Sequence, residues 1–251
     1  MTIINRFSVI LAAAGKSARF KDSKNTLYAK NISDKKPFIP LCGKSVWEHS
    51  VSIFATNKRI DQIIIVVAPE DYSFFETKFS EQINKWRLEL VMGGQERFES
   101  IENALKHVRT DIDFIAIHDA ARPCVTKQQI HDVFQTAEQF GAAILASPLV
   151  GTIKRTVPTI QIEKKGENFS TKDIIETIPR DNLWEAQTPQ VFQKKLIIDA
   201  YANRKNVTNI TDDAQLVENL GRLVKIVPSD RSNIKITTIS DLLFAEQFLK
   251  R

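Results

Sequence analysis

The run Gln62-Ile-Ile-Ile-Val-Val-Ala68 is continuously apolar after its first residue and mostly β-branched, and this feature most constrains the fold. Such a run is typical of a parallel strand that is buried on both faces. Parallel strands need crossover connections, which are usually helices. Shorter apolar runs predict further strands of the same sheet at Phe7–Leu11, Leu88–Met92, Phe114–Ile117 and Ala142–Ala146.

Helical patterns separate these strands. Ser45–Phe54 and Ser100–Val108 each place their apolar residues on one helical face. Thr126–Phe140 begins with a capping box and is followed by Gly141, where a helix-ending glycine belongs. The alternation predicts an α/β fold, with a Rossmann-like, mostly parallel sheet and helices on both faces. Ligands of such folds bind at the carboxyl ends of the strands.

The C-terminal part of the chain continues the alternation. We expect Thr211 to cap a helix that ends at Gly221, and Arg222–Val227 to return as a strand. Ser240 is expected to start a final amphipathic helix. With 251 residues, the chain has the length of one large α/β domain, residues 1–251.

One segment breaks the pattern. Residues 150–182 are polar, mix β-formers with lysines, and contain the turn Lys164-Lys165-Gly166-Glu167-Asn168. They predict an extended β-arm that is too thin to have a core of its own. We expect such an arm to pack on a second copy of the chain, which gives a homodimer.

Composition excludes several classes of protein. The net charge of +5 comes without a dense run of Lys and Arg, so we expect no nucleic-acid partner. No stretch has the apolar length of a membrane span, and the apolar run near the N-terminus leads into a Gly-Lys-Ser loop, which is unlike a signal peptide. Cys42 and Cys124 lack metal-ligand spacing, and two cysteines in a chain of this length favour the reducing cytoplasm.

The first strand leads into a phosphate-binding type of loop. Leu11-Ala-Ala-Ala-Gly-Lys-Ser-Ala-Arg19 combines small residues, which let backbone N–H groups approach a phosphate chain, with basic residues that neutralise it. It is not a Walker A loop, because Ile10 stands where the first glycine belongs. Further on, Pro37 restricts the preceding Lys36 to extended geometry. Taken alone, the first segment is more commonly a tight strand–helix turn with a solvated arginine, and Lys36 is more commonly a solvated loop lysine.

Two later motifs lie where strands end. Gly93-Gly-Gln-Glu-Arg-Phe-Glu-Ser100 places paired glycines before a helix, so the backbone can approach a ligand. In His118-Asp-Ala-Ala-Arg-Pro123, Asp119 at the carboxyl end of a buried strand suits Mg²⁺, and Arg122 suits phosphate. His118 is interpreted as a structural residue rather than a ligand.

Taken together, these motifs resemble the 2-C-methyl-D-erythritol 4-phosphate cytidylyltransferases of the isoprenoid precursor pathway. The resemblance runs from about Val9 to Phe248 and also includes Thr188-Pro-Gln190 and Asn233-Ile-Lys-Ile-Thr237. It implies a single nucleotidyltransferase domain, CTP as donor, pyrophosphate as product, Mg²⁺ as cofactor, and a homodimer whose β-arms reach the partner's active site.

The resemblance also implies roles for individual residues. Transition-state stabilisation falls to Arg19 and Lys36, with help from Lys235 at the phosphates. Asp119 binds the metal and touches the acceptor. The nucleotide is held by Ala13, Ala14, Gly15, Gly94, Gln95, Ser100 and Ala120. The acceptor is contacted by Asp119, Arg122, Thr152, Arg180, Thr188 and Thr211, of which Thr152, Arg180 and Thr188 come from the other subunit or its arm.

The chemistry is consistent with these residue types. The acceptor phosphate is already an anion at neutral pH, so it can attack the α-phosphorus of CTP without a strong general base. The difficulty is bringing two polyanions together, which positive side chains and Mg²⁺ address.

The chain departs from the family pattern between Arg19 and Lys36. The segment is longer than expected and contains Lys21, Lys24, Lys30 and Lys35, any of which could replace Lys36. Pro37 also stands where the family usually has a polar residue. The pair Lys36-Pro37 resembles instead the Lys-Pro of nucleotidyltransferases for other sugar phosphates.

Two further alternatives remain open at this stage. One is a ribitol-5-phosphate cytidylyltransferase, which shares the Gln187–Gln190 and Ser232–Lys235 runs. His118-Asp-Ala-Ala-Arg122 favours the erythritol enzyme over it. The other is a non-catalytic nucleotide-binding protein on the same fold, against which the joint presence of Arg19, Lys36, Asp119 and Lys235 argues.

Overall fold

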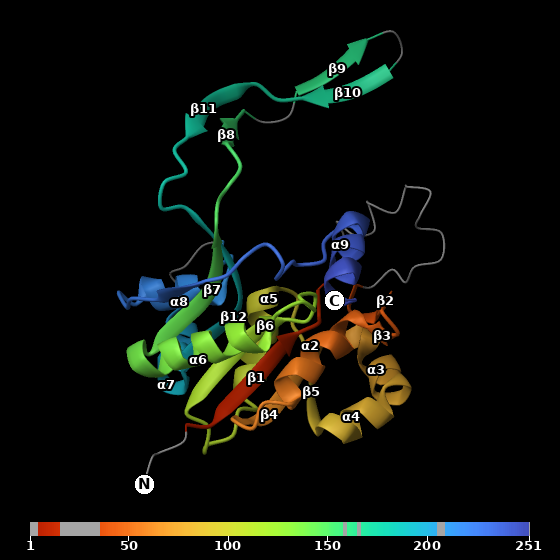
Figure 1. Ribbon diagram of the computed structural model, residues 1–251, viewed down its shortest axis with the longest axis vertical. Helices are drawn as coiled ribbons and strands as arrows, with labels where there is room; N and C mark the ends of the chain where they lie inside the picture. Colours follow the sequence, from red (N-terminus) through yellow and green to blue (C-terminus); the bar gives the residue numbers. More distant parts are fainter. Residues whose placement is uncertain (1–4, 16–35, 158–159, 165–166, 205–208, 251) are drawn as a thin grey trace. The chain divides into compact units, whose positions relative to one another are not determined.

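A computed structural model describes residues 5–15, 36–157, 160–164, 167–204 and 209–250. Side chains are described within these ranges, except those of residue 36 and of residues 158–170. The chain divides into two compact units (Figure 1). The first comprises Met1–Ala146 and Ala186–Arg251, and the second Ser147–Glu185. We describe each unit by itself, and the predicted single-domain organisation with a β-arm at 150–182 stays a prediction.

A seven-stranded sheet organises the first unit, in the order β13-β7-β12-β6-β1-β4-β5. β1 lies parallel to both β4 and β6, β5 is parallel to β4, and β13 is parallel to β7, whereas β12 runs antiparallel to β6. The predicted α/β class with a mostly parallel sheet is therefore confirmed. The strands are β1 (Phe7–Ala12), β4 (Ile60–Val67), β5 (Leu88–Met92), β6 (Phe114–Asp119), β7 (Ala142–Pro148), β12 (Trp184–Gln193) and β13 (Lys225–Pro228), and a separate short pair is β2 (Pro40–Leu41) with β3 (Lys44–Ser45).

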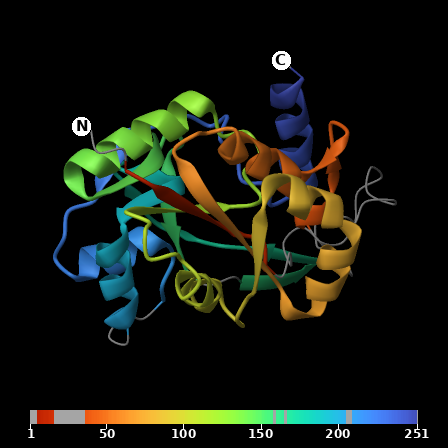
Figure 2. The same cartoon turned by 90° about the horizontal axis from the view of Figure 1, so that it is seen from below.

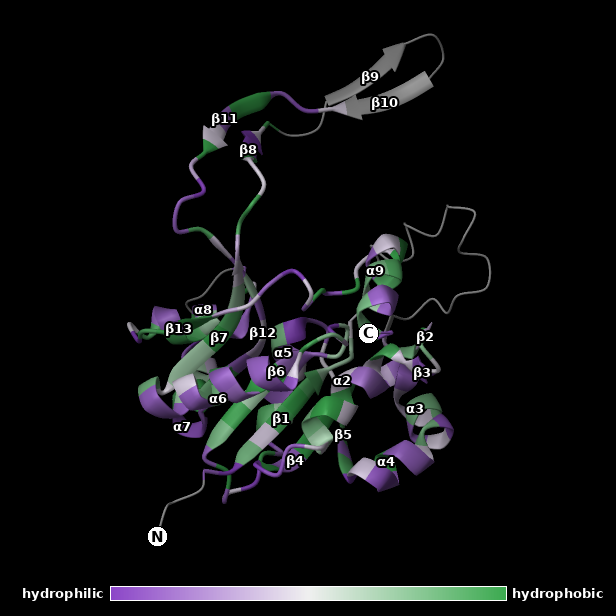
Figure 3. Ribbon diagram, in the orientation of Figure 1, coloured by the Kyte–Doolittle hydropathy of each residue, from purple (hydrophilic) through white to green (hydrophobic). Residues whose placement is uncertain are grey.

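Helices cover both faces of this sheet (Figure 2). On one face the aromatic residues Trp47, Phe54 and Phe134 pack with the odd-numbered apolar residues of β1 and β4. On the other face Ile10, Ile64 and Val66 pack against the helices around residues 101 and 200. Strand residues of both faces are therefore apolar, while the outer helix surfaces are hydrophilic (Figure 3). The helices are α2 (Val46–Ala55), α3 (Tyr72–Lys78), α4 (Ser80–Trp86), α5 (Arg97–Leu105), α6 (Lys127–Phe140), α7 (Lys194–Ala202), α8 (Asp213–Asn219) and α9 (Ile239–Leu249), with short 3-10 turns η2 (Lys36–Phe38) and η3 (Pro69–Asp71).

The best-signalled helix forms as predicted. Thr126 caps α6, since its hydroxyl accepts from the Gln129 N–H and the Gln129 side chain reciprocates. Gly141 ends the helix with a φ of 85°, a left-handed conformation that glycine adopts without a Cβ penalty.

Two predicted helix starts are wrong by one or two residues. The cap of α8 is Asp212, whose carboxylate accepts from the Gln215 N–H, and not Thr211. The cap of α9 is Thr238, and Ser240 already lies inside the helix. In both cases a neighbouring side chain with equal capping ability has the extended backbone that the cap position needs.

The sequence pattern does not predict α3, α4, α7 or β12. The helices α3 and α4 have seven residues each, too few to show a clear apolar period. β12 contains Pro189, and proline within a run argues against a central strand. Its pairing with β6 runs from Gln190 to Gln193, after the proline, so the missing N–H interrupts no bond of that ladder.

The second unit consists of two antiparallel strand pairs. β8 (Ile153–Thr156) pairs with β11 (Ile174–Ile178), and β9 (Ile160–Lys164) pairs with β10 (Glu167–Thr171). Within this unit Ile174 and Ile175 expose 61% and 59% of their surface, so the β8–β11 pair leaves large apolar side chains in solvent. Its proposed role in dimerisation stays a prediction.

Candidate functional site

The centre of the candidate site is Asp119, the last residue of β6. Its position is fixed by the sheet, because Ala12 at the end of β1 pairs with Asp119 and the Ala120 N–H donates to the Ala12 carbonyl over 3.1 Å. The Asp119 N–H donates to the Thr188 hydroxyl over 3.0 Å. Asp119 is only 7% exposed. A carboxylate is thus held at the carboxyl end of a parallel strand, where ligands of such sheets bind.

Three cationic side chains surround this carboxylate. Lys235 Nζ lies 2.7 Å from Asp119 Oδ2, Arg122 Nε lies 3.6 Å from the same oxygen, and Arg97 Nε lies 3.4 Å from Oδ1. Burial by itself raises the pKa of Asp119, but the charges of Arg97, Lys235 and Arg122 outweigh it and hold the pKa well below its usual range. Asp119 is therefore ionised throughout the physiological pH range.

A buried hydrogen-bond network positions Lys235. The Asn233 side-chain amide donates to Gln187 Oε1 and to the Thr188 carbonyl, over 3.0 and 2.9 Å. Arg122 Nη1 donates to the Asn233 carbonyl over 2.7 Å. Asn233 is fully buried, and the hydrogen bonds of its side-chain N–H groups and its carbonyl favour one low-energy arrangement of this segment. Lys235 therefore follows a fixed segment and reaches Asp119 from it.

His118 has a structural role, as the sequence indicated. It is fully buried, and burial lowers its pKa to about 4, so the ring is neutral at pH 7. Its Nε2 lies 3.1 Å from the Arg122 carbonyl, which can only accept, and its Nδ1 lies 3.1 Å from the Thr188 hydroxyl. The ring therefore carries its proton on Nε2, and the Thr188 hydroxyl donates to Nδ1.

The two small-residue loops of the sequence meet beside this centre. A Cβ added to Gly93 would lie 2.7 Å from the Ala14 Cβ and 2.8 Å from the Ser100 Oγ, so only glycine fits between them. The Ala13 N–H donates to the Val66 carbonyl over 2.9 Å, which anchors the Ala-Ala-Gly loop to β4. The predicted nucleotide-binding segments are therefore adjacent in the fold.

The Gly-Gly loop is closed by side chains of its own helix. Gly94 N–H donates to Ser100 Oγ over 3.0 Å, and the Glu99 carboxylate accepts from the Gln95 and Glu96 N–H groups over 2.7 and 3.1 Å. The Ser100 hydroxyl in turn donates to the Glu96 carbonyl. A ligand that takes these N–H groups has to exchange places with Glu99 or Ser100.

Arg97 is a site residue that the sequence does not predict, although it lies inside the Gly93–Ser100 motif. Arg97 begins α5 and bridges Asp119 and Asp213, the latter with Nη2 2.8 Å from Oδ2. Its partner Asp213 is fully buried at the start of α8. The sequence pattern predicts a role for Thr211 but none for Asp213, because nothing in the sequence pairs Asp213 with an arginine far away in the chain.

Four predicted residues lie outside the described side chains of the first unit. Arg19 lies outside the described residues, and Lys36 is described only as the start of η2. Thr152 and Arg180 are exposed residues of the second unit, where Arg180 Nη1 donates to the Val150 carbonyl.

Thr211 and Thr188 both have hydrogen bonds within the protein. The Thr211 N–H and hydroxyl donate to Gln215 Oε1 over 2.8 and 3.2 Å. The Thr188 hydroxyl joins Asp119 to His118 and is only 5% exposed. Their acceptor-binding roles stay predictions.

A metal at this site would depend on Asp119. Across the described residues no three His, Cys, Asp or Glu side chains gather into a metal-binding group. Mg²⁺ is commonly held by one or two carboxylates together with substrate phosphates, so a single ionised Asp at the strand end fits Mg²⁺ and does not fit a metal that needs an all-protein cage.

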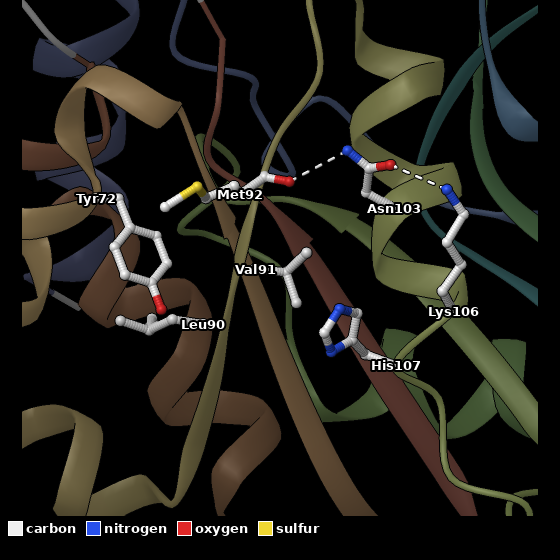
Figure 4. A pocket seen from close by; sticks show the side chains of 7 residues that line it. All are labelled: Tyr72, Leu90, Val91, Met92, Asn103, Lys106 and His107. Atoms are coloured by element: carbon white, nitrogen blue, oxygen red, sulfur yellow. Dashed lines mark hydrogen bonds between the residues drawn. The ribbon is translucent and has the colours of Figure 1, made fainter.

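A separate groove lies on the edge strand β5. Figure 4 shows Asn103 donating to the Met92 carbonyl and Lys106 donating to Asn103, each over 3.3 Å. The groove shares no residue with the Asp119 centre. It is lined by Tyr72, Leu90, Val91, Met92, Asn103, Lys106 and His107.

In the described part of the chain, no helix has the length and apolar character to cross a membrane.

Comparisons with known proteins agree with this geometry. The profile of a family described as 2-C-methyl-D-erythritol 4-phosphate cytidylyltransferase matches residues 7–251. A relative of that name from Alkaliphilus oremlandii is 36% identical over 252 residues, covering 100% of this chain and 98% of the relative. Another from Clostridioides difficile is 36% identical over 244 residues, covering 97% and 93%.

Solved structures give the same result. The 4-diphosphocytidyl-2C-methyl-D-erythritol synthase of Anaerococcus prevotii superposes with a TM-score of 0.75 at 27% identity, over 99% of this chain and 100% of that one. The 2-C-methyl-D-erythritol 4-phosphate cytidylyltransferase of Francisella tularensis gives 0.75 at 28% identity, over 97% and 100%.

Proposed function

This chain belongs to the 2-C-methyl-D-erythritol 4-phosphate cytidylyltransferase family, and we propose on that basis how its site performs the reaction. The enzyme transfers CMP from CTP to 2-C-methyl-D-erythritol 4-phosphate, giving 4-diphosphocytidyl-2-C-methyl-D-erythritol and pyrophosphate in the non-mevalonate isoprenoid pathway. It is a nucleotidyltransferase, and the erythritol phosphate supplies the attacking oxygen.

The observation that carries the proposal is the charge arrangement at the end of β6. One ionised, buried carboxylate lies within 3.6 Å of Lys235, Arg97 and Arg122. The local excess of positive charge lowers the repulsion between a triphosphate and a phosphate monoester. Charges that are already fixed in place need no reorganisation as charge develops on the leaving pyrophosphate.

Each cation has a proposed task. Lys235 neutralises phosphate charge next to Asp119, and Arg122, held by Asn233, orients the acceptor phosphate. Arg19 and Lys36, assigned from the family resemblance, stabilise the transition state. The remaining assignments are that Ala13, Ala14, Gly15, Gly94, Gln95, Ser100 and Ala120 hold the nucleotide and Thr188 and Thr211 serve the acceptor.

We assign the cofactor Mg²⁺ to Asp119. When bound, the ion neutralises charge on the phosphates and polarises the bond to the leaving group. The support for this assignment is the ionised state of Asp119 and its position at the strand end. Lys235 then remains to hold the second carboxylate oxygen.

The proposed enzyme is a cytoplasmic homodimer. The β-arm at 150–182 brings Thr152 and Arg180 to the acceptor site of the partner subunit, which agrees with the apolar side chains that this unit exposes. Both cysteines are free in the structure, as expected in a reducing compartment. We propose no nucleic-acid or membrane partner.

The test is pyrophosphate release by the purified protein with Mg²⁺ and 2-C-methyl-D-erythritol 4-phosphate, comparing CTP with ATP, UTP and GTP. Release with CTP well above that with the other nucleotides is expected. A parallel assay with ribitol 5-phosphate controls for the acceptor. Equal or faster release with ribitol 5-phosphate would contradict the assignment of the acceptor.

A further inference from the structure

Arg97 lies between two carboxylates and divides its contacts unequally. Its Nη2 is 2.8 Å from Asp213 Oδ2, whereas its Nε is 3.4 Å from Asp119 Oδ1. A guanidinium that is free to choose approaches a carboxylate to about 2.7–2.9 Å with two parallel hydrogen bonds. Asp213 therefore has the strong contact, and Asp119 only a long one.

Asp213 can hold the arginine because it is itself fixed. It is fully buried, and its Oδ1 accepts from the Tyr201 hydroxyl over 2.5 Å. Its N–H and that of Ala214 both donate to Gln190 Oε1 on β12, over 3.1 and 3.0 Å. Burial raises the pKa of Tyr201 well above its ordinary value, so the phenol stays protonated and remains a donor. Neither oxygen of Asp213 can turn away without losing a hydrogen bond, to Tyr201 at Oδ1 or to Arg97 at Oδ2.

This division leaves the two oxygens of Asp119 in different states. Oδ2 has Lys235 Nζ at 2.7 Å and Arg122 Nε at 3.6 Å. Among the contacts described, Oδ1 has only the 3.4 Å approach of Arg97. Oδ1 is therefore the oxygen with lone-pair capacity for a further ligand.

We propose that Asp213 is a positioning residue that holds Arg97 back from Asp119 and thereby keeps Asp119 Oδ1 accessible to a divalent cation. The inference rests on the proposed function only in that it takes Asp119 as the metal-binding carboxylate. Without the charge of Asp213, Arg97 turns towards Asp119 and competes with the cation for the same oxygen. Residues that orient a metal ligand in this way typically change metal affinity by about 10–100-fold when substituted.

The matched substitutions are Asp213→Asn and Asp212→Asn. Both remove one negative charge from the N-terminal end of α8, so a purely electrostatic effect is similar for the two. Asp212 contacts Gln215 and Gln190 and has no described contact with Arg97, and asparagine is also a good helix cap. Tyr201→Phe is a third variant, which keeps all charges and removes one anchor of Asp213.

The experiment measures the dissociation constant of Mn²⁺ from the enzyme–CTP complex, using the electron paramagnetic resonance signal of free Mn²⁺. Without an acceptor CTP is not consumed, so the measurement is at equilibrium and independent of turnover. The full chain is used, and melting temperatures show that each variant is folded. Each substitution is also made in an Arg97→Gln background.

Asp213→Asn is expected to weaken Mn²⁺ binding about tenfold or more. The losses expected for Asp212→Asn, and for Asp213→Asn in the Arg97→Gln background, are less than about threefold, because neither lets an arginine compete. Tyr201→Phe is expected to weaken binding by a smaller factor in the same direction.

Three results would overturn the inference: a loss below about threefold for Asp213→Asn, an equal loss for Asp212→Asn, or an undiminished loss when Arg97 is already absent. Pyrophosphate release by the wild-type enzyme is scored separately. If the wild-type enzyme releases no pyrophosphate but Asp213→Asn weakens Mn²⁺ binding only when Arg97 is present, the proposed reaction is rejected and the positioning role stands. If pyrophosphate is released but Asp213→Asn does not weaken Mn²⁺ binding in this way, only the positioning role is rejected.

Discussion

Replacing Lys235 with methionine removes one charge from the Asp119 centre while keeping most of the side-chain volume. At 2.7 Å, two unit charges attract by about 6 kcal/mol at an effective dielectric constant of ~20. The Lys235 side chain is 34% exposed, and solvent screening at that exposure reduces the attraction to about 3 kcal/mol. The same charge acts on phosphate oxygens that develop charge beside Asp119, so we expect a similar loss in the transition state.

A loss of about 3 kcal/mol corresponds to a fall in kcat of about 10²-fold. Because the charge acts mainly where negative charge develops, the CTP dissociation constant is expected to rise by less than about tenfold. Arg97 and Arg122 still compensate Asp119, so the free energy of unfolding falls by only about 1–2 kcal/mol. Steady-state kinetics, CTP binding without acceptor, and thermal unfolding measure the three quantities.

Lys225→Met is the matched control. Lys225 carries the same charge in the same compact unit, but it lies on β13 with its Nζ over the ring of Phe140, the last residue of α6. Its substitution is expected to leave kcat within about twofold of wild type. If Lys235→Met keeps kcat within about threefold of wild type, or if Lys225→Met loses as much activity, the assigned role of Lys235 is wrong.

Three further predictions concern single side chains. Gly94→Ala is expected to weaken CTP binding about tenfold or more in calorimetric titrations, because the added Cβ would lie 2.4 Å from a side-chain carbon of α5. The control is Gly151→Ala, whose added Cβ meets nothing within 4 Å and which should leave CTP binding unchanged. Thr188→Val strands two buried hydrogen-bond partners and is expected to lower the free energy of unfolding by about 2–3 kcal/mol, most of which Thr188→Ser should recover in urea titrations. Burial raises the pKa of Cys124 to about 12, so iodoacetamide at pH 8 should alkylate exposed Cys42 alone in the folded protein and both thiols in urea. The unfolded Cys124 thiol ionises first as pH rises above its ordinary pKa of 9.0, so stability falls from that pH towards pH 12, and Cys124→Ala should flatten this slope.

The local signals predicted much of the fold. The apolar runs at β1, β4, β5, β6 and β7 identified five sheet strands, because a strand buried on both faces has to be apolar throughout. The capping box of α6 and Gly141 fixed that helix to the residue, since both are interactions within a few positions of the chain. Short helices and the proline-containing β12 were missed because their stability comes from packing rather than from local pattern.

The candidate site was predicted in part. Asp119 and Arg122 were assigned from a motif and Lys235 from the family resemblance, and the structure brings all three together. Arg97 lies in the Gly93–Ser100 motif, but the motif alone predicts no role for it. Whether an arginine faces solvent or a buried carboxylate depends on a partner elsewhere in the chain. That partner, Asp213, lies 116 positions away in the sequence.

The sequence by itself therefore determined the α/β class, the residue types of the site and, through family resemblance, the reaction. Those properties depend on runs of a few residues, whose chemistry is independent of contacts with distant parts of the chain. Only the tertiary structure decided how the cations are arranged around Asp119. Lys235 lies at 2.7 Å from its carboxylate, whereas Arg97 lies at 3.4 Å and is paired with Asp213. Parallel strand register and the packing of α8 against β12 set these distances, and electrostatic energies depend on distances that no local sequence pattern records.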